Sequence, residues 1–267
     1  MGKTKRLPSI YLAIVFIVLY APIFYLIYYS FNSAGTMHSF ENFTFDWYRE
    51  VFQDTRLFII LLNTLVIALL SSVISTVMGV VGAIAITRTR EKRFRNALLT
   101  LNNVMIVSPD VIIGASFLAF FVMIGIKLGF GSVLISHIAF CVPIVVLMVL
   151  PNLEEMSPTL IDAARDLGAS TWDVLIRVII PYISPGILGG FFMALTYSLD
   201  DFAVTFFVTG SGFSTLSVEI YSLARRGISL TINALSTLIF LITLFLVIGY
   251  YIISKQGMKL KEGGISQ

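Results

Sequence analysis

Cysteine, histidine and charged residues are all scarce in this chain of 267 residues. The one cysteine, Cys141, excludes an intramolecular disulfide and a thiolate metal cluster, so we expect it to pack as a small apolar residue. With only His38 and His137, a histidine-based metal site lacks ligands, and His137 is expected to pack or to form hydrogen bonds. The triplet Gly2-Lys3-Thr4 lacks the upstream glycine and strand of a phosphate-binding loop. We therefore expect no metal and no cofactor in this chain.

The scarcity of charge defines the class of protein. Only 12% of the residues are charged and 57% are hydrophobic, with a mean hydropathy of +0.93. A water-soluble domain could not bury that much apolar surface in one core, which indicates an all-α integral membrane protein. The first apolar run is too long for a signal peptide and lacks a cleavage site, so it is expected to be retained. Six runs are long enough to cross a bilayer as helices, namely Ile10–Phe31, Phe58–Ile86, Ala97–Ile126, Ser132–Leu150, Ile187–Val208 and Ile232–Ser254.

Basic residues predict the orientation of these spans, because Lys and Arg are retained on the cytoplasmic side. With the N-terminus inside, thirteen of the eighteen Lys and Arg residues fall on inner segments. The prediction is a cytoplasmic N-terminus (1–9), a six-span permease domain (10–254) with a cytoplasmic loop at 152–183, and a cytoplasmic tail (255–267). The basic run from Arg88 is then a membrane anchor, and no nucleic-acid partner is expected.

A charged hairpin interrupts the apolar runs from Ile161 to Pro181. Ser157 and Pro158 supply an N-cap and a first-turn proline for an amphipathic helix. Gly168 can adopt the left-handed conformation that ends this helix, and Ser170 with Asp173 forms a capping box that opens a second one. Pro181 and Pro185 are expected to mark the approach to the membrane. Capping signals alone would fit an ordinary connector.

The spacing in this hairpin resembles the EAA motif of ABC-importer permeases, whose pattern is Glu-Ala-Ala, three residues, Gly, nine residues, then Ile-x-Leu-Pro. In this chain Asp162 replaces the Glu, Val178 replaces the Ile and Ile180 replaces the Leu. In that family the loop docks into a groove of a cytoplasmic ATPase, so its small residues would permit close approach of the helices. The resemblance implies an ATPase-coupling role for the positions in register, which are Asp162, Ala163, Ala164, Gly168, Val178, Ile180 and Pro181.

Further segments extend the resemblance along nearly the whole chain: SPDVI at Ser108, SHIAFCVP at Ser136, SLDD at Ser198, FVTG at Phe207 and NALST at Asn233. Together they are similar to the permease family of spermidine/putrescine ABC importers. The resemblance implies a type I (MetI-like) permease fold in the bacterial cytoplasmic membrane, without catalysis of its own. It also implies a second, related permease, two copies of an ATPase that binds ATP and Mg, and an extracytoplasmic polyamine-binding protein.

Three carboxylates within the apolar runs carry a separate argument about the substrate. An ionised carboxylate at the bilayer centre costs about 2.5–3.5 kcal/mol on insertion scales, so Asp110, Asp200 and Asp201 are expected to face a cavity. Tyr197 lies one helical turn before the pair, where its ring would suit an alkylammonium group. Adjacent helical residues do not share a face, so only one of Asp200 and Asp201 is expected to face the pathway. These four residues are the predicted substrate pathway for a polyamine.

The same carboxylates allow structural roles. Asp110 follows Pro109 at an expected break in its span and could serve as an N-cap. Asp200 and Asp201 could cap a helix break or bond to a partner subunit. In the outer loops, Trp47 and Tyr48 suit an interfacial anchor. Contacts with an external binding protein are predicted among Glu41, Asp46, Arg49, Glu50, Asp54, Arg56, Glu219, Arg225 and Arg226.

Other functions remain open at this stage. An ABC permease for another solute, such as a different cation, ferric iron or an anion, would share the architecture, although intramembrane carboxylates disfavour an anion. An intramembrane aspartyl protease would require a Tyr-Asp and a Gly-x-Gly-Asp pattern, and neither occurs. An ATP-independent carrier would not co-purify with an ATPase.

Overall fold

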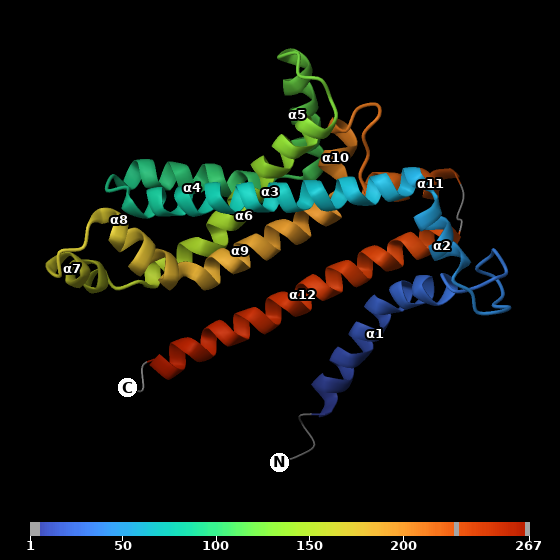
Figure 1. Ribbon diagram of the computed structural model, residues 1–267, viewed down its shortest axis with the longest axis horizontal. Coiled ribbons are helices and arrows are strands. Elements are labelled where there is room, and N and C mark those ends of the chain that lie inside the picture. Colours follow the sequence, from blue (N-terminus) through green and yellow to red (C-terminus); the bar gives the residue numbers. More distant parts are fainter. Residues whose placement is uncertain (1–5, 227–229, 265–267) are drawn as a thin grey trace. The chain divides into compact units, whose positions relative to one another are not determined.

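Every regular element that the structure describes is helical (Figure 1). The computed structural model describes residues 6–226 and 230–264, and side chains over 10–225 and 230–252. Residues 1–5 of the expected N-terminal segment, residues 265–267 of the expected tail and the side chain of Arg226 lie outside these ranges. The chain divides into two compact units, one formed by Met1–Ile59 and Glu219–Thr243 and the other by Ile60–Val218 and Leu244–Gln267.

The first unit contains α1 (Arg6–Tyr29) and α2 (Asp46–Gln53), with the beginning of α3 and parts of two later helices. Helix α1 is apolar around its whole circumference and none of its membrane window is buried, as expected for a helix in contact with lipid or another subunit. The loop after α1 is held by side chains of α2. The indole of Trp47 donates to the carbonyl of Asn32 at 2.7 Å, and the hydroxyls of Tyr48 and Ser30 lie 2.7 Å apart.

The second unit is built around α6 (Phe130–Glu155), which packs against α3 (Thr55–Arg88) and α9 (Ile180–Asp200). Cys141 is fully buried in this core, which confirms its predicted packing role. Val145 of α6 fits between two glycines, Gly79 of α3 and Gly190 of α9. A Cβ atom at these glycines would lie 2.6 Å and 3.1 Å from Val145. The absence of side chains there lets three helices approach closely.

The third expected span is bent, as Pro109 predicted. Helices α4 (Lys92–Val107) and α5 (Asp110–Met123) meet at an angle of 105°, which is visible where α5 leaves α4 in Figure 1. Ser108 is extended (φ −69°, ψ 138°), the conformation that a following proline favours. Five helices in the described residues are long and apolar enough to cross a membrane, and six if this pair forms one span.

The hairpin begins with α7 (Pro158–Asp166) and α8 (Thr171–Val174), and a π-helical turn at Leu175–Ile179 leads directly into α9. Pro181 and Pro185, which are expected to mark the approach to the membrane, both lie within α9 near its beginning. Pro185 has no N–H for the carbonyl of Pro181, and the hydroxyl of Ser184 donates to that carbonyl instead, at 2.9 Å. A neighbouring hydroxyl of this kind lets a membrane helix accommodate proline.

Helix α9 ends at Asp200, so the predicted fifth span, Ile187–Val208, is wrong at both ends. The helix begins before Ile187, and α10 (Ala203–Val208) is a separate short helix after a break at Asp201 and Phe202. The chain ends with α11 (Leu216–Arg226) and α12 (Leu230–Gly264). This break between α9 and α10 forms one side of the site described next.

Candidate functional site

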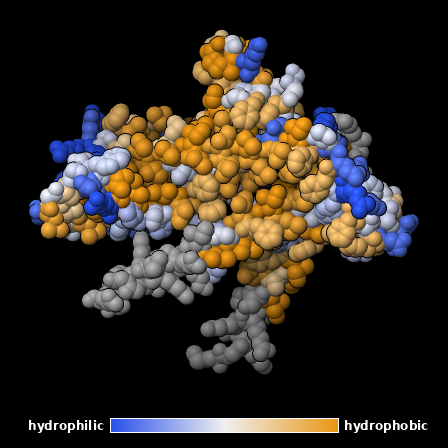
Figure 2. Space-filling view, in the orientation of Figure 1, coloured by the Kyte–Doolittle hydropathy of each residue, from blue (hydrophilic) through white to orange (hydrophobic). Residues whose placement is uncertain are grey.

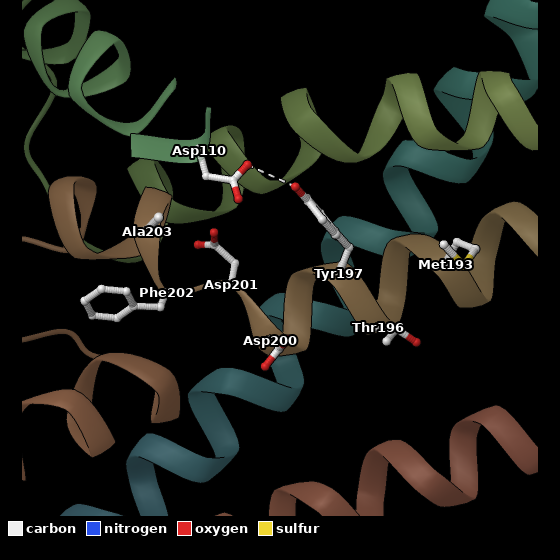
Figure 3. Close-up of a pocket in the computed structure, with 8 residues that line it drawn as sticks. All are labelled: Asp110, Met193, Thr196, Tyr197, Asp200, Asp201, Phe202 and Ala203. Atoms are coloured by element: carbon white, nitrogen blue, oxygen red, sulfur yellow. Dashed lines mark hydrogen bonds between the residues drawn. The ribbon is translucent and has the colours of Figure 1, made fainter. Parts of the chain in front are cut away.

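A cavity of about 340 Å³ lies at the end of α9 that is remote from the hairpin (Figure 3). A helix of 21 residues is about 30 Å long, so the two features lie a bilayer core apart along α9. No lining residue among those described is cationic, and three are carboxylates. The lining comprises Asp110, Met193, Thr196, Tyr197, Asp200, Asp201, Phe202 and Ala203. The structure thus brings all four predicted pathway residues into one cavity.

Asp110 and Tyr197 are paired across two helices. The hydroxyl of Tyr197, on α9, donates to Oδ1 of Asp110, on α5, at 3.0 Å. The ring of Phe140 meets the Tyr197 ring edge-on, with centroids 5.3 Å apart. Asp110 does not act as the expected alternative N-cap, because Pro109 holds that position and no side-chain hydrogen bond caps α5 among the described residues. Its exposed carboxylate therefore faces the cavity.

Asp200 and Asp201 both line the cavity, but their environments differ. Asp201 accepts hydrogen bonds from the backbone N–H groups of Val204 and Thr205, at 3.3 and 2.8 Å, and from the Thr205 hydroxyl, at 2.7 Å. Only 5% of its side chain is exposed. Asp200 is exposed, and Figure 3 shows its carboxylate pointing away from Asp110 while that of Asp201 points toward it. Asp201 therefore has the capping role that was considered as an alternative.

A buried polar cluster lies behind the cavity and was not predicted as a unit. His137 of α6 is fully buried, with one ring nitrogen 2.7 Å from Ser198 Oγ and the other 2.8 Å from Thr205 Oγ1. This confirms that His137 forms hydrogen bonds. Its partners are 61 and 68 residues away in the sequence. The one signal in the sequence was the isolation of a histidine within an apolar span.

The hairpin has the caps that its sequence predicted. The Ser157 side chain accepts from the N–H of Thr159, and the Ser170 side chain accepts from the N–H of Asp173. Gly168 is left-handed, with φ +84°. The N–H of Gly168 bonds to the carbonyl of Arg165, and the next N–H bonds to that of Ala164. This pair of bonds is a Schellman motif, which satisfies carbonyls at the end of α7.

Most of the EAA-like positions lie on the surface of this hairpin. Asp162, Ala163, Gly168 and Pro181 are exposed, whereas Ala164, Val178 and Ile180 are partly buried. Two large apolar side chains are also exposed, Leu167 at 89% and Trp172 at 69%. Figure 2 shows hydrophilic and hydrophobic residues mixed around α7 and α8, in contrast to the apolar surface over the middle of α3. An exposed apolar patch with a polar rim is typical of a protein interface.

The candidate contacts for a binding protein fall into two groups. Arg49 and Asp46 are exposed on α2, with 3.9 Å between Nη1 and Oδ1. Glu219 is buried, and its Oε2 lies 2.6 Å from Nη2 of Arg56. A buried carboxylate in an ion pair is poorly placed to bind a partner, so Glu219 holds the first unit together instead.

Comparison with known proteins places this geometry in a family. The model of the family described as "Binding-protein-dependent transport system inner membrane component" matches residues 75–257. The spermidine/putrescine transport system permease protein PotC of Escherichia coli K12 is 34% identical over 257 residues, covering 96% of each chain.

Two solved structures share the fold. A bacterial ABC transporter that imports the polysaccharide alginate has a TM-score of 0.72 at 20% identity, covering 94% of each chain. The inward-facing MetNI methionine ABC transporter has a TM-score of 0.64 at 18% identity, covering 77% of this chain and 99% of the other. The predicted MetI-like permease fold is confirmed.

Proposed function

Because this chain belongs to the family of binding-protein-dependent transport system inner membrane components, we propose that it forms one half of the translocation pathway of a polyamine ABC importer. The observation that carries the proposal is the cavity of three carboxylates without a cationic lining residue among those described. Spermidine and putrescine carry separated ammonium groups on an apolar stem. The carboxylates at the beginning of α5 and at the end of α9 provide complementary charge, and the ring of Tyr197 provides an aromatic face. The name of the PotC relative supports the same substrate class.

The exposure of two of these carboxylates supports a second permease as partner. Asp110 and Asp200 are exposed in this single chain. Asp200 ends a helix long enough to cross the bilayer, and Asp110 begins α5 on the other side of the cavity. Because an ionised carboxylate in contact with lipid is unfavourable, these groups require a water-filled path or a protein neighbour. A second, related permease opposite the cavity would supply the other wall. This chain would then contribute half of a heterodimeric pathway.

The hairpin is the proposed contact with the ATPase. It exposes Leu167 and Trp172, and its second half continues through the π-helical turn into α9, which ends at the cavity. Movement of an ATPase against α7 and α8 would therefore reach Asp200 through one continuous helix. Two copies of a cytoplasmic ATPase would bind ATP and Mg, and this chain would hydrolyse nothing itself. An extracytoplasmic protein would deliver the polyamine on the opposite side of the bacterial cytoplasmic membrane.

Substitution of the cavity acids tests the proposed function. We expect Asp110→Asn and Asp200→Asn each to raise KM for spermidine uptake about tenfold, because each removes a charge-assisted interaction. Tyr197→Phe should have a smaller effect, since it leaves the carboxylates and the aromatic ring in place. Glu91→Gln, which removes an exposed acid outside the cavity, is the matched control and should leave KM unchanged. Unchanged KM in both Asp variants would show that the cavity is not part of the substrate pathway.

A further inference from the structure

Five buried or nearly buried polar side chains form a chain of contacts behind the cavity. Ser71 Oγ of α3 lies 2.9 Å from Ser198 Oγ of α9, which lies 2.7 Å from Nδ1 of His137. On the other side of the ring, Nε2 of His137 lies 2.8 Å from Thr205 Oγ1 of α10 and 3.5 Å from Oδ2 of Asp201. The cluster thus connects α3, α6, α9 and α10 and ends on a carboxylate that lines the cavity.

The direction of one hydrogen bond fixes the direction of the next. The Thr205 hydroxyl donates its single proton to Oδ2 of Asp201, at 2.7 Å. Its oxygen can therefore only accept from His137, so Nε2 of the imidazole must carry a proton. The ring donates toward α10 through Nε2, and Nδ1 meets the Ser198 hydroxyl on α9. The imidazole holds these two nitrogen atoms in fixed positions on one rigid ring.

The two contacts of the ring lie on opposite sides of a helix break. Ser198 belongs to the last turn of α9, and Thr205 belongs to α10. Between them, Asp201 and Phe202 leave the helix and line the cavity, together with Ala203 at the beginning of α10. Because His137 comes from α6, it fixes the position of α10 relative to α9. It also orients Asp201 indirectly, through Thr205.

We propose that His137 is a positioning residue for the substrate cavity, which sets the geometry of the α9–α10 break by joining Ser198 to the Thr205–Asp201 pair. This role rests on the proposed function only in that the cavity binds substrate. The contacts of His137 with Ser198 and Thr205, here called the joint, are part of the fold whatever the substrate is. Loss of the Thr205 contact releases the side of the cavity formed by Asp201 and Ala203. Loss of the Ser198 contact leaves that side in place.

Two substitutions separate the halves of the joint. His137→Gln places an amide N–H near the position of Nε2 and retains a donor for Thr205. His137→Asn places its amide near the position of Nδ1 and retains only the contact with Ser198. The matched pair at Thr205 is Thr205→Ser, which keeps the hydroxyl, and Thr205→Val, which has nearly the same shape without it. The valine variant leaves His137 intact and so remains informative if histidine variants fold poorly.

A cysteine at the cavity wall reports the geometry directly. Cys141 is the one native cysteine, so Cys141→Ser gives a background for Ala203→Cys, with Gln53→Cys on α2 as an exposed control. In membranes that contain the assembled importer, the rate of labelling by aminoethyl methanethiosulfonate is measured at position 203. We expect His137→Asn and Thr205→Val to change this rate at least about fivefold, and His137→Gln and Thr205→Ser to leave it within about twofold. Labelling at position 53 should be constant.

Uptake kinetics supply the second readout. His137→Asn should raise KM for spermidine and leave the maximal rate and the amount of assembled complex nearly unchanged, and His137→Gln should restore KM. Equal labelling at position 203 in all four variants would overturn the positioning role, as would equal effects of His137→Gln and His137→Asn. If spermidine proves not to be the substrate, the labelling result still decides the role of His137, so the two proposals fail separately.

Discussion

At the scale of single residues, Gly168 has the most specific backbone requirement in the hairpin. Its φ of +84° lies in the left-handed region, yet an added Cβ atom would meet nothing within 4 Å in this chain. A residue with a side chain there costs about 1–2 kcal/mol in backbone energy. The barrier to substitution within this chain is therefore conformational rather than steric.

This distinction gives a prediction for Gly168. If backbone strain alone matters, Gly168→Ala and Gly168→Leu should weaken retention of the ATPase equally during purification, and Gly168→Asn should weaken it less because Asn tolerates this conformation. If the ATPase also approaches closely, as the EAA resemblance implies, Leu should be worse than Ala. Normal ATPase retention in the Leu variant would contradict a coupling role for the hairpin.

Asp201 carries the second prediction at this scale. Asp201→Ala removes the acceptor for two backbone N–H groups and the Thr205 hydroxyl, and loss of such a cap costs about 1 kcal/mol. Asp201→Asn keeps one carbonyl acceptor. We expect the Ala variant to lower the thermal stability of the purified complex more than the Asn variant does. Equal stability of the wild-type protein and the Ala variant would show that the cap is dispensable.

Single residues differ in how far the sequence predicts them. The left-handed Gly168 and the caps at Ser157 and Ser170 depend on neighbours within a few positions, so the sequence identified them. The bond between Tyr197 and Asp110 joins residues 87 apart, and no local pattern encodes it. The sequence predicted both as pathway residues, Asp110 because a carboxylate in an apolar span is costly wherever it folds, and Tyr197 because its ring lies one helical turn before Asp200 and Asp201.

At the scale of elements, the packing of α3 and α9 on α6 depends on small residues. A Cβ atom at Gly79 would lie 2.6 Å from both Cβ and Cγ1 of Val145, whose branched side chain has little freedom to move aside. We expect Gly79→Leu to force α3 from α6 and lower the yield of folded, assembled complex. Gly249→Leu in α12 is the control, since nothing lies within 4 Å of its Cβ position. Equal yields of the two variants would contradict this packing.

The continuity of α9 was not predicted. Pro181 and Pro185 are typical helix breakers, and the sequence placed the end of the hairpin there. The structure retains the helix because the π-helical turn precedes Pro181, where the N–H of Ile180 bonds to the carbonyl of Leu175, and because Ser184 satisfies the carbonyl of Pro181. Apolar periodicity identifies a span. The π-helical turn and the Ser184 hydrogen bond depend on local backbone geometry, which composition does not encode.

At the scale of the whole molecule, the distribution of Lys and Arg predicts the orientation. In a Cys141→Ser background, a membrane-impermeant thiol reagent applied to intact cells should label Lys127→Cys, in the loop between α5 and α6. The reagent should label Arg165→Cys, on α7, only after the cells are permeabilised. Both side chains are exposed, so burial does not limit the reaction. Labelling of position 165 in intact cells would show that the orientation is the opposite of the predicted one. The hairpin would then lie on the side of the membrane away from the ATPase.

The most direct test of the central claim is uptake of labelled spermidine by cells that lack this gene and by cells that carry it again, with unlabelled putrescine as competitor. We predict that the gene restores ATP-dependent uptake and that putrescine competes, because a cavity lined by carboxylates would bind separated ammonium groups. Equal uptake in both strains would contradict the polyamine assignment and direct the search to other cations, while the permease fold would stand.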